Sequence, residues 1–147
     1  MKQRLSMRKQ FPEGVKLMGE LDGLIKGSGI DPRHIELIKI RASQINGCAY
    51  CMNSHTKDAL QLGEDPHRLY VLSGWREARD WFSEEEQTIL QLTEEITLIS
   101  RQGLSEAVYE KGLALFGEAR LAFLIMAIVS INAWNRVGVA LSMHPIK

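Results

Sequence analysis

Signals for the start and the end of helices divide this chain into segments of helical length. Asp31 and Asp65 each precede a proline, an order typical of a helix N-terminus because the first helical position needs no amide hydrogen. Ser83 and Glu86 have the spacing of a capping box, and the Asn46–Gly47 step is typical of a helix end. Alternating runs of β-branched residues are nearly absent. The chain is therefore predicted to be all-α.

The expected helices follow these signals along the chain. They cover about residues 12–27, 32–46, 48–63, 66–81, 83–103, 105–117 and 118–142. The last of them contains Leu121–Ile131, a nearly unbroken apolar run of eleven residues, which is shorter than the roughly 20 residues that cross a bilayer. A helix that is apolar on every side must be covered on every side. We therefore expect a central core helix with one flank in a subunit interface, and hence a homo-oligomer.

Length and charge limit the classes of partner. With 147 residues and 45% hydrophobic side chains, the chain suits one compact helical-bundle domain over residues 1–147. Eighteen basic and eighteen acidic side chains give no net charge and form no basic run, which argues against binding to nucleic acid. Residues 1–11 are expected to form a flexible basic arm, and they lack the apolar stretch of a signal peptide or membrane anchor. We expect a cytoplasmic protein that does not bind a membrane.

The two cysteines of the chain, Cys48 and Cys51, lie at the start of the third expected helix and are followed by His55. These positions are separated by three and four residues, so their side chains share one helix face. The positive end of a helix dipole stabilises a thiolate. The spacing therefore lets His55 exchange a proton with Cys51, and lets Cys48 close a disulfide with it. In a reducing cytosol, a CxxC pair is more often a redox or metal group than a structural bridge.

Other interpretations of the cysteine cluster stay open at this point. Two cysteines and His55 can ligate zinc, with Glu36 or water as the fourth ligand, although the chain has no further cysteine for a usual structural zinc site. The cysteines can also be inert and buried. Glu36 lies in line with Lys39 and Ser43 on the preceding helix. It would face the cysteines if the two helices pack as a hairpin, and would otherwise be a surface acid.

The stretch from Glu36 to His55 resembles the signature of the alkylhydroperoxidase D-like (AhpD-like) branch of the carboxymuconolactone decarboxylase superfamily. The shared features are a glutamate twelve residues before the first cysteine, an Asn-Gly step into the CxxC pair, and a histidine four residues after the second cysteine. The resemblance extends more loosely through Trp81–Thr97 and into Ile131–Arg136 of the last helix. It thus covers most of the chain after Phe11.

This resemblance implies an all-helical AhpD-like domain that assembles as trimers or hexamers. It implies a peroxidase of antioxidant defence that reduces alkyl hydroperoxides through its cysteine pair. A dithiol donor, either a protein or a small thiol, regenerates the pair, and no bound cofactor or metal is implied. Carried over by position, the resemblance makes Cys51 the peroxidatic thiolate and Cys48 the resolving thiol, with His55 and Glu36 in a proton relay.

Tyr50 departs from the pattern of the family prototype, which has a second histidine directly before the second cysteine. A phenol is a poorer proton shuttle at neutral pH than an imidazole, so the relay is shortened or rebuilt through water. We therefore expect slow peroxidase turnover. The alternative function is a zinc-binding or redox-sensing module that uses the CxxCxxxH cluster without turnover. Decarboxylase activity is less expected, because members of the superfamily with that activity typically lack the cysteine pair.

Overall fold

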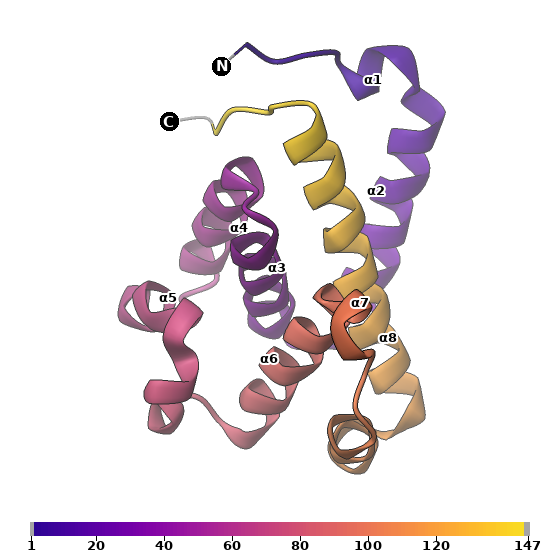
Figure 1. The fold of residues 1–147 in the computed structure, drawn as a ribbon. Coiled ribbons are helices and arrows are strands. Elements are labelled where there is room, and N and C mark those ends of the chain that lie inside the picture. Colours follow the sequence, from indigo (N-terminus) through magenta and orange to yellow (C-terminus); the bar gives the residue numbers. More distant parts are fainter. Residues whose placement is uncertain (1, 146–147) are drawn as a thin grey trace.

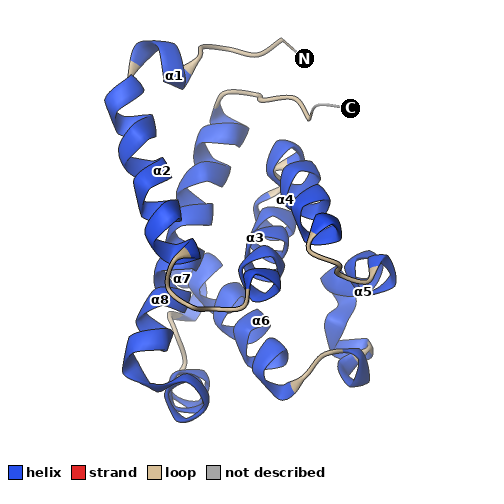
Figure 2. Cartoon of the chain, turned by 180° about the vertical axis from the view of Figure 1, so that it is seen from behind, coloured by secondary structure: helices blue, strands red, loops and turns tan. Residues whose placement is uncertain are grey.

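The structure is a computed structural model that describes residues 2–145, and all of its regular elements in that range are helical (Figures 1 and 2). The predicted all-α fold is confirmed. The α-helices are α1 (Met7–Gln10), α2 (Pro12–Lys26), α3 (Pro32–Asn46), α4 (Ala49–Gln61), α5 (Pro66–Val71), α6 (Glu84–Thr97), α7 (Ile99–Gln102) and α8 (Glu106–Ala140). Two 3-10 helices, η1 (Leu72–Glu77) and η2 (Arg79–Trp81), lie between α5 and α6.

The predicted N-terminal capping residues of three helices are confirmed. The Asp31 carboxylate accepts a hydrogen bond from the Arg33 amide at 2.8 Å and so begins α3. Asp65 begins α5 in the same way. Ser83 and Glu86 form the predicted capping box of α6, in which each side chain bonds the backbone N–H of the other.

Two of the predicted helices are broken by local conformations that the sequence pattern does not show. The helix expected over residues 66–81 ends at Val71 and continues as η1 and η2. The reason is Trp75, which is 1% exposed and packs in the core, so tertiary packing overrides the helical pattern there. The helix expected over 83–103 is interrupted at Leu98. The predicted boundary at Gly117 is confirmed, because its φ of 70° divides α8 into two helical segments.

Helix α3 lies at the centre of the fold, against α4, α6 and α8, while α2 runs along the outer side of α8 (Figure 1). All residues of α3 from Ile35 to Ile40 are buried, so this helix is covered on every side. The second segment of α8 supplies the core residues Leu121, Leu124, Ala127, Ile128 and Ile131. By length and composition α8 could cross a membrane, but these buried side chains fit the predicted core helix.

Glu94 on α6 holds three elements together. Its carboxylate accepts hydrogen bonds from Arg41 Nε of α3 at 2.8 Å and from the Trp75 indole at 2.9 Å, and it pairs with Arg76 of η1. Burial opposes ionisation of Glu94, but the bonds from Trp75, Arg76 and Arg41 outweigh it and hold the pKa of this carboxyl below its ordinary value. The ionised form therefore stabilises the fold and the position of α3 within it.

Glu94→Gln is expected to lower the free energy of unfolding at neutral pH by about 2 kcal/mol. Because the folded pKa lies below the unfolded one, this stabilisation is fully present above the unfolded pKa and is lost as the pH falls through the folded pKa. The difference between variant and wild type should therefore shrink in acid. Urea titrations at neutral and acidic pH measure it, with Glu77→Gln on the exposed surface as the control. An equal difference at both pH values would contradict this account.

Candidate redox site

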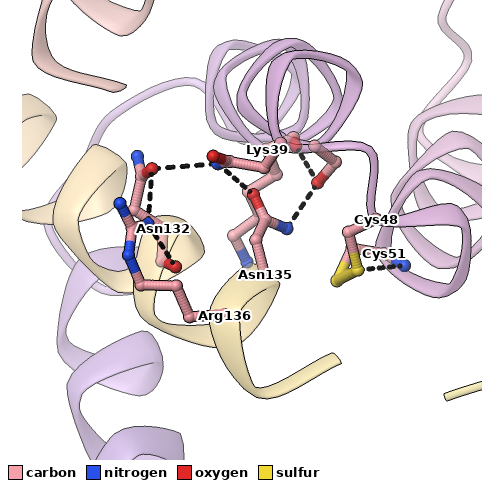
Figure 3. The surroundings of a disulfide bond; sticks show 8 residues. Lys39, Cys48, Cys51, Asn132, Asn135 and Arg136 are labelled. Carbon is pink, nitrogen blue, oxygen red and sulfur yellow. Dashed lines mark hydrogen bonds between the residues drawn. A yellow bond between two sulfur atoms is a disulfide. The ribbon is translucent and has the colours of Figure 1, made fainter. Parts of the chain in front are cut away.

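Cys48 and Cys51 form a disulfide at the start of α4 (Figure 3). Cys48 is the N-cap of the helix, and its sulfur accepts a hydrogen bond from the Cys51 amide at 3.3 Å. Gly47 creates this arrangement, because its left-handed backbone with φ of 67° ends α3 and turns the chain directly into α4. The predicted placement of a CxxC pair at a helix N-terminus is confirmed, and both cysteines are buried, at 2% and 5% exposure.

Glu36 and His55 meet across the hairpin of α3 and α4. Their side chains are joined by a 2.8 Å contact between Glu36 Oε2 and His55 Nδ1, and the glutamate is only 4% exposed. The alternative of a surface acid at position 36 is therefore wrong, since Glu36 is buried and contacts α4. Asp58, one turn after His55, lies 3.8 Å from the same Nδ1 atom. This second carboxylate is a neighbour that the sequence analysis did not single out.

A cavity of about 490 Å³ opens over Cys51, and we call it the Cys51 chamber. It brings together predicted site residues and residues with no predicted role. Its lining is Gln3, Ser6, Met7, Arg8, Val15, Asp22, Tyr50, Cys51, Ser54, His55, Trp134, Val137, Leu141 and Met143. Tyr50 thus lies in the chamber wall beside Cys51 and His55. Glu36 is absent from this lining and lies behind His55, where it lines a separate cavity with Asp58.

The N-terminal arm contributes to the chamber through four residues between positions 3 and 8. It is attached to the end of α8 by Arg4, whose amide donates to the Leu141 carbonyl at 3.0 Å and whose guanidinium donates to the Ala140 carbonyl at 2.8 Å. Part of the arm is helical, as α1. Only the basic composition of the arm was evident from the sequence, and nothing there indicated that it lies over the cysteines.

A network of polar side chains joins α3 to α8 close to the disulfide (Figure 3). Asn135, which is fully buried, donates to Ser43 Oγ at 2.9 Å. Asn46 Nδ2 lies 2.9 Å from the side-chain oxygens of both Asn135 and Asn132. The sequence offered one signal for this network, namely two asparagines shortly after the apolar run Leu121–Ile131, but it did not reveal their partners. The network fixes the distance between α8 and the turn that carries the cysteines.

Gly138 of α8 is a further residue whose role is not evident from the sequence. A Cβ atom built on it would lie 2.8 Å from Cys48 Sγ and 3.5 Å from Cys51 Sγ. The absence of a side chain is therefore what lets α8 pack directly against the disulfide. A glycine within a helix is unfavourable by itself. Its occurrence at position 138 was the only feature of the sequence that could have indicated this contact.

Gly138→Ala is expected to lower the melting temperature of the oxidised protein by several degrees, because either α8 or the disulfide must move. Gly19→Ala in α2 is the matched control, since nothing lies within 4 Å of a Cβ there. Alanine favours the helix, so this control should raise the melting temperature. Thermal unfolding followed by circular dichroism measures both variants. A Gly138→Ala protein as stable as Gly19→Ala would show that the close packing of α8 against the disulfide does not contribute to stability.

The disulfide bears on the alternative of a zinc site at the CxxCxxxH cluster. While the two sulfurs are bonded to each other they are not thiolate ligands, so the CxxCxxxH set could hold a metal only after reduction. Among the described residues, the group whose ligand atoms lie near enough to hold a metal ion is Glu36, His55 and Asp58, all within 4.8 Å of one another. It contains neither cysteine.

Comparison with known proteins places this geometry in a family. A profile described as the carboxymuconolactone decarboxylase family matches residues 12–95. The uncharacterized protein YdfG of Bacillus subtilis (strain 168) is 40% identical over 141 residues, which cover 96% of this chain and 95% of that protein. Both comparisons include the hairpin of α3 and α4 that carries the cysteines.

Two solved structures share the fold. One is a protein of unknown function from Agrobacterium tumefaciens, assigned provisionally as the antioxidant defence protein AhpD, with a TM-score of 0.94, 33% identity and coverage of 99% of this chain and 100% of that one. The other is an uncharacterized peroxidase-related protein from Silicibacter sp. TM1040, with a TM-score of 0.70, 26% identity and coverage of 80% of this chain and 61% of that one. The chain therefore belongs to the carboxymuconolactone decarboxylase family and to its AhpD-like branch.

Proposed function

We propose that this protein is a thiol-dependent peroxidase that reduces organic hydroperoxides through Cys51 and Cys48 and is regenerated by a dithiol donor. The observation that carries the proposal is the position of Cys51, which can form a disulfide with Cys48 and which opens into a chamber also lined by His55. The relatives assigned to antioxidant defence and related to peroxidases support the same chemistry. We further propose that the protein acts in the cytoplasm without a bound cofactor or metal.

The reaction begins at the reduced form of the pair. The Cys51 thiolate attacks the terminal peroxide oxygen, the O–O bond breaks, and the alkoxide leaves as an alcohol after taking up a proton. Cys51 is now a sulfenic acid. The Cys48 thiol then attacks the Cys51 sulfur, the S–O bond breaks, and water leaves as the disulfide forms. One hydroperoxide is thereby reduced by two electrons to one alcohol and one water.

His55 is the group placed to supply the proton to the leaving alkoxide. Its Nδ1 atom is held by Glu36, so Nε2 is the ring nitrogen left to exchange a proton on the chamber side, where His55 forms part of the wall. Glu36 acts through this contact and does not line the chamber itself. Tyr50 also lines the chamber, and we propose that it makes turnover slow because a phenol shuttles protons poorly at neutral pH.

The proposal is tested by peroxide turnover. Purified protein with dithiothreitol as donor should consume cumene hydroperoxide with many turnovers per molecule. The double variant Cys48→Ser/Cys51→Ser gives the background rate. Wild-type consumption equal to that background would refute the peroxidase. If the disulfide still formed and opened with thiol reagents in that case, the pair would instead belong to a redox-sensing module.

An exposed apolar row on α8 supports the proposal of a homo-oligomer, either a trimer or a hexamer. Phe123, Met126 and Val129 follow one another at intervals of three residues and are 38%, 38% and 44% exposed. Such a row on the surface of a core helix is typical of a protein interface. We propose that a second copy of the chain covers it.

Met126→Glu is expected to break this assembly, because the new charge would be buried at the interface. Sedimentation velocity should show wild type well above the 16.6 kDa of one chain, and the variant close to it. Tyr70→Glu on α5, on the far side of the fold from α8 (Figure 1), is the control and should sediment like wild type. A wild type of 16.6 kDa at micromolar concentration would contradict the assembly.

A further inference from the structure

The two sulfurs of the disulfide reach two different cavities. Cys51 lines the chamber of about 490 Å³, which Cys48 does not. Cys48 lines a smaller cavity of about 250 Å³, which Cys51 does not. We call the smaller cavity the Cys48 groove, and its lining is Gly47, Cys48, Ala49, Gly138, Val139, Ser142, Met143, His144 and Pro145. Met143 belongs to both linings.

The chamber and the groove differ in the solvent exposure of their lining residues. Apart from Gln3 and Arg8, the residues of the chamber are buried or half-buried, and the arm lies over it. Five of the nine residues of the groove are exposed, namely Gly47, Ala49, Val139, His144 and Pro145. A small hydroperoxide can enter the chamber beneath the arm. A thiol carried by a larger donor is better accommodated by the more open of the two cavities, which is the groove at Cys48.

The two linings also differ in charge. The chamber contains Arg8, Asp22 and His55. The groove contains no aspartate, glutamate, lysine or arginine. At Gly47 and Gly138 it is lined by backbone alone, because these residues have no side chain. The groove therefore presents no carboxylate, ammonium or guanidinium group that would bind or repel a charged donor thiol.

We propose that the two half-reactions use opposite sides of the disulfide: hydroperoxide reaches Cys51 through the chamber, and the donor thiol attacks Cys48 through the groove. This inference rests on the proposed function and adds to it the route of the reductant. It assigns Cys48 two tasks, resolution of the sulfenic acid and reception of the donor.

The donor reduces the disulfide in two successive thiol–disulfide exchanges. The donor thiolate attacks Cys48 Sγ, the bond between Cys48 and Cys51 breaks, and its electron pair goes to Cys51, which leaves as a thiolate. The second thiol of the donor then attacks the donor sulfur of the mixed disulfide and releases Cys48, which takes up a proton. The donor is oxidised by two electrons to its own disulfide. Cys51 is returned in the chamber as the thiolate that the next hydroperoxide needs.

Neighbouring valines of α8 allow a matched test, because Val139 lines the groove and Val137 lines the chamber. The disulfide is first formed with diamide, so that the reductive step needs no peroxidase activity. Val139→Trp should slow reduction of that disulfide by glutathione about tenfold, with less than a twofold change in the oxidation of the reduced protein by cumene hydroperoxide. Val137→Trp should do the reverse. Equal slowing by both variants, slowing of reduction by Val137→Trp alone, or no effect of either would overturn the two routes.

A second measurement uses wild-type protein and does not depend on the folding of a variant. The diamide-formed disulfide is mixed with glutathione, quenched with acid within milliseconds, and mapped by mass spectrometry. Glutathione on Cys48 with a free Cys51 thiol is the expected product, and glutathione on Cys51 would overturn the assignment. If the protein fails to react with hydroperoxide while glutathione still enters at Cys48, the proposed function is wrong and the groove assignment survives.

Discussion

Cys51→Ser is expected to lower the rate of hydroperoxide reduction by about 1,000-fold or more, because a serine hydroxyl is not ionised at neutral pH and is a poor nucleophile toward peroxide oxygen. The loss should appear in a single turnover of the reduced protein, followed by stopped flow with cumene hydroperoxide. It should not be accompanied by unfolding, since serine has the shape of cysteine with a smaller atom in place of the sulfur and creates no steric clash.

Cys48→Ser is the control for that experiment, because it removes the other half of the same disulfide. This variant should keep the first oxidation step at close to the wild-type rate and turn over more slowly in steady state, since only the external dithiol can then resolve the sulfenic acid. The contrast separates the nucleophile from the resolving thiol. Should the two variants exchange these behaviours, the roles assigned to the cysteines would have to be reversed.

Glu36→Gln should lower the rate at which the reduced protein reacts with hydroperoxide by about 100-fold, the lower end of the contribution from a positioned proton-transfer group. The physical reason is the loss of the buried carboxyl group whose oxygen lies 2.8 Å from His55 Nδ1. The measurement is the second-order rate constant of thiol oxidation as a function of pH, and a change of its pH profile distinguishes a positioning role from a merely structural one.

Glu64→Gln provides the matched control for Glu36→Gln. Glu64 is buried to a similar degree, at 5% exposure against 4% for Glu36, and its partner is Arg68, away from the cysteines. It should leave the rate of thiol oxidation within twofold of wild type. Equal rates for Glu36→Gln and wild type would mean that the contact with His55 is structural only.

The local parts of the fold could be predicted because their causes are local. Asp31, Asp65 and the pair Ser83 and Glu86 act on backbone groups within three residues, so the starts of α3, α5 and α6 are visible in the sequence itself. The 3-10 segments after Val71 could not be predicted, because they depend on the packing of the Trp75 side chain and on its hydrogen bond to Glu94 of α6.

The same division applies to the candidate site. Helical periodicity is enough to place Cys48, Cys51 and His55 on one face. It left open whether Glu36 faces them or the solvent, and the packing of α3 against α4 decides this by bringing Glu36 to His55. The close approach of Gly138, the network around Asn135 and the cover over the chamber depend on how α8 and the N-terminal arm pack. Those contacts join residues about ninety or more positions apart, for which a single sequence carries little signal.

In the proposed mechanism, hydroperoxide oxidises the Sγ atom of Cys51. This assignment is tested most directly by trapping the sulfenic acid in reduced Cys48→Ser protein, where it cannot be resolved, with dimedone present while cumene hydroperoxide is added. Peptide mass spectrometry should find the dimedone adduct on Cys51 within the time of one turnover. An intact Cys51 thiol in that protein, after exposure to hydroperoxide that oxidises the wild-type pair, would contradict the account.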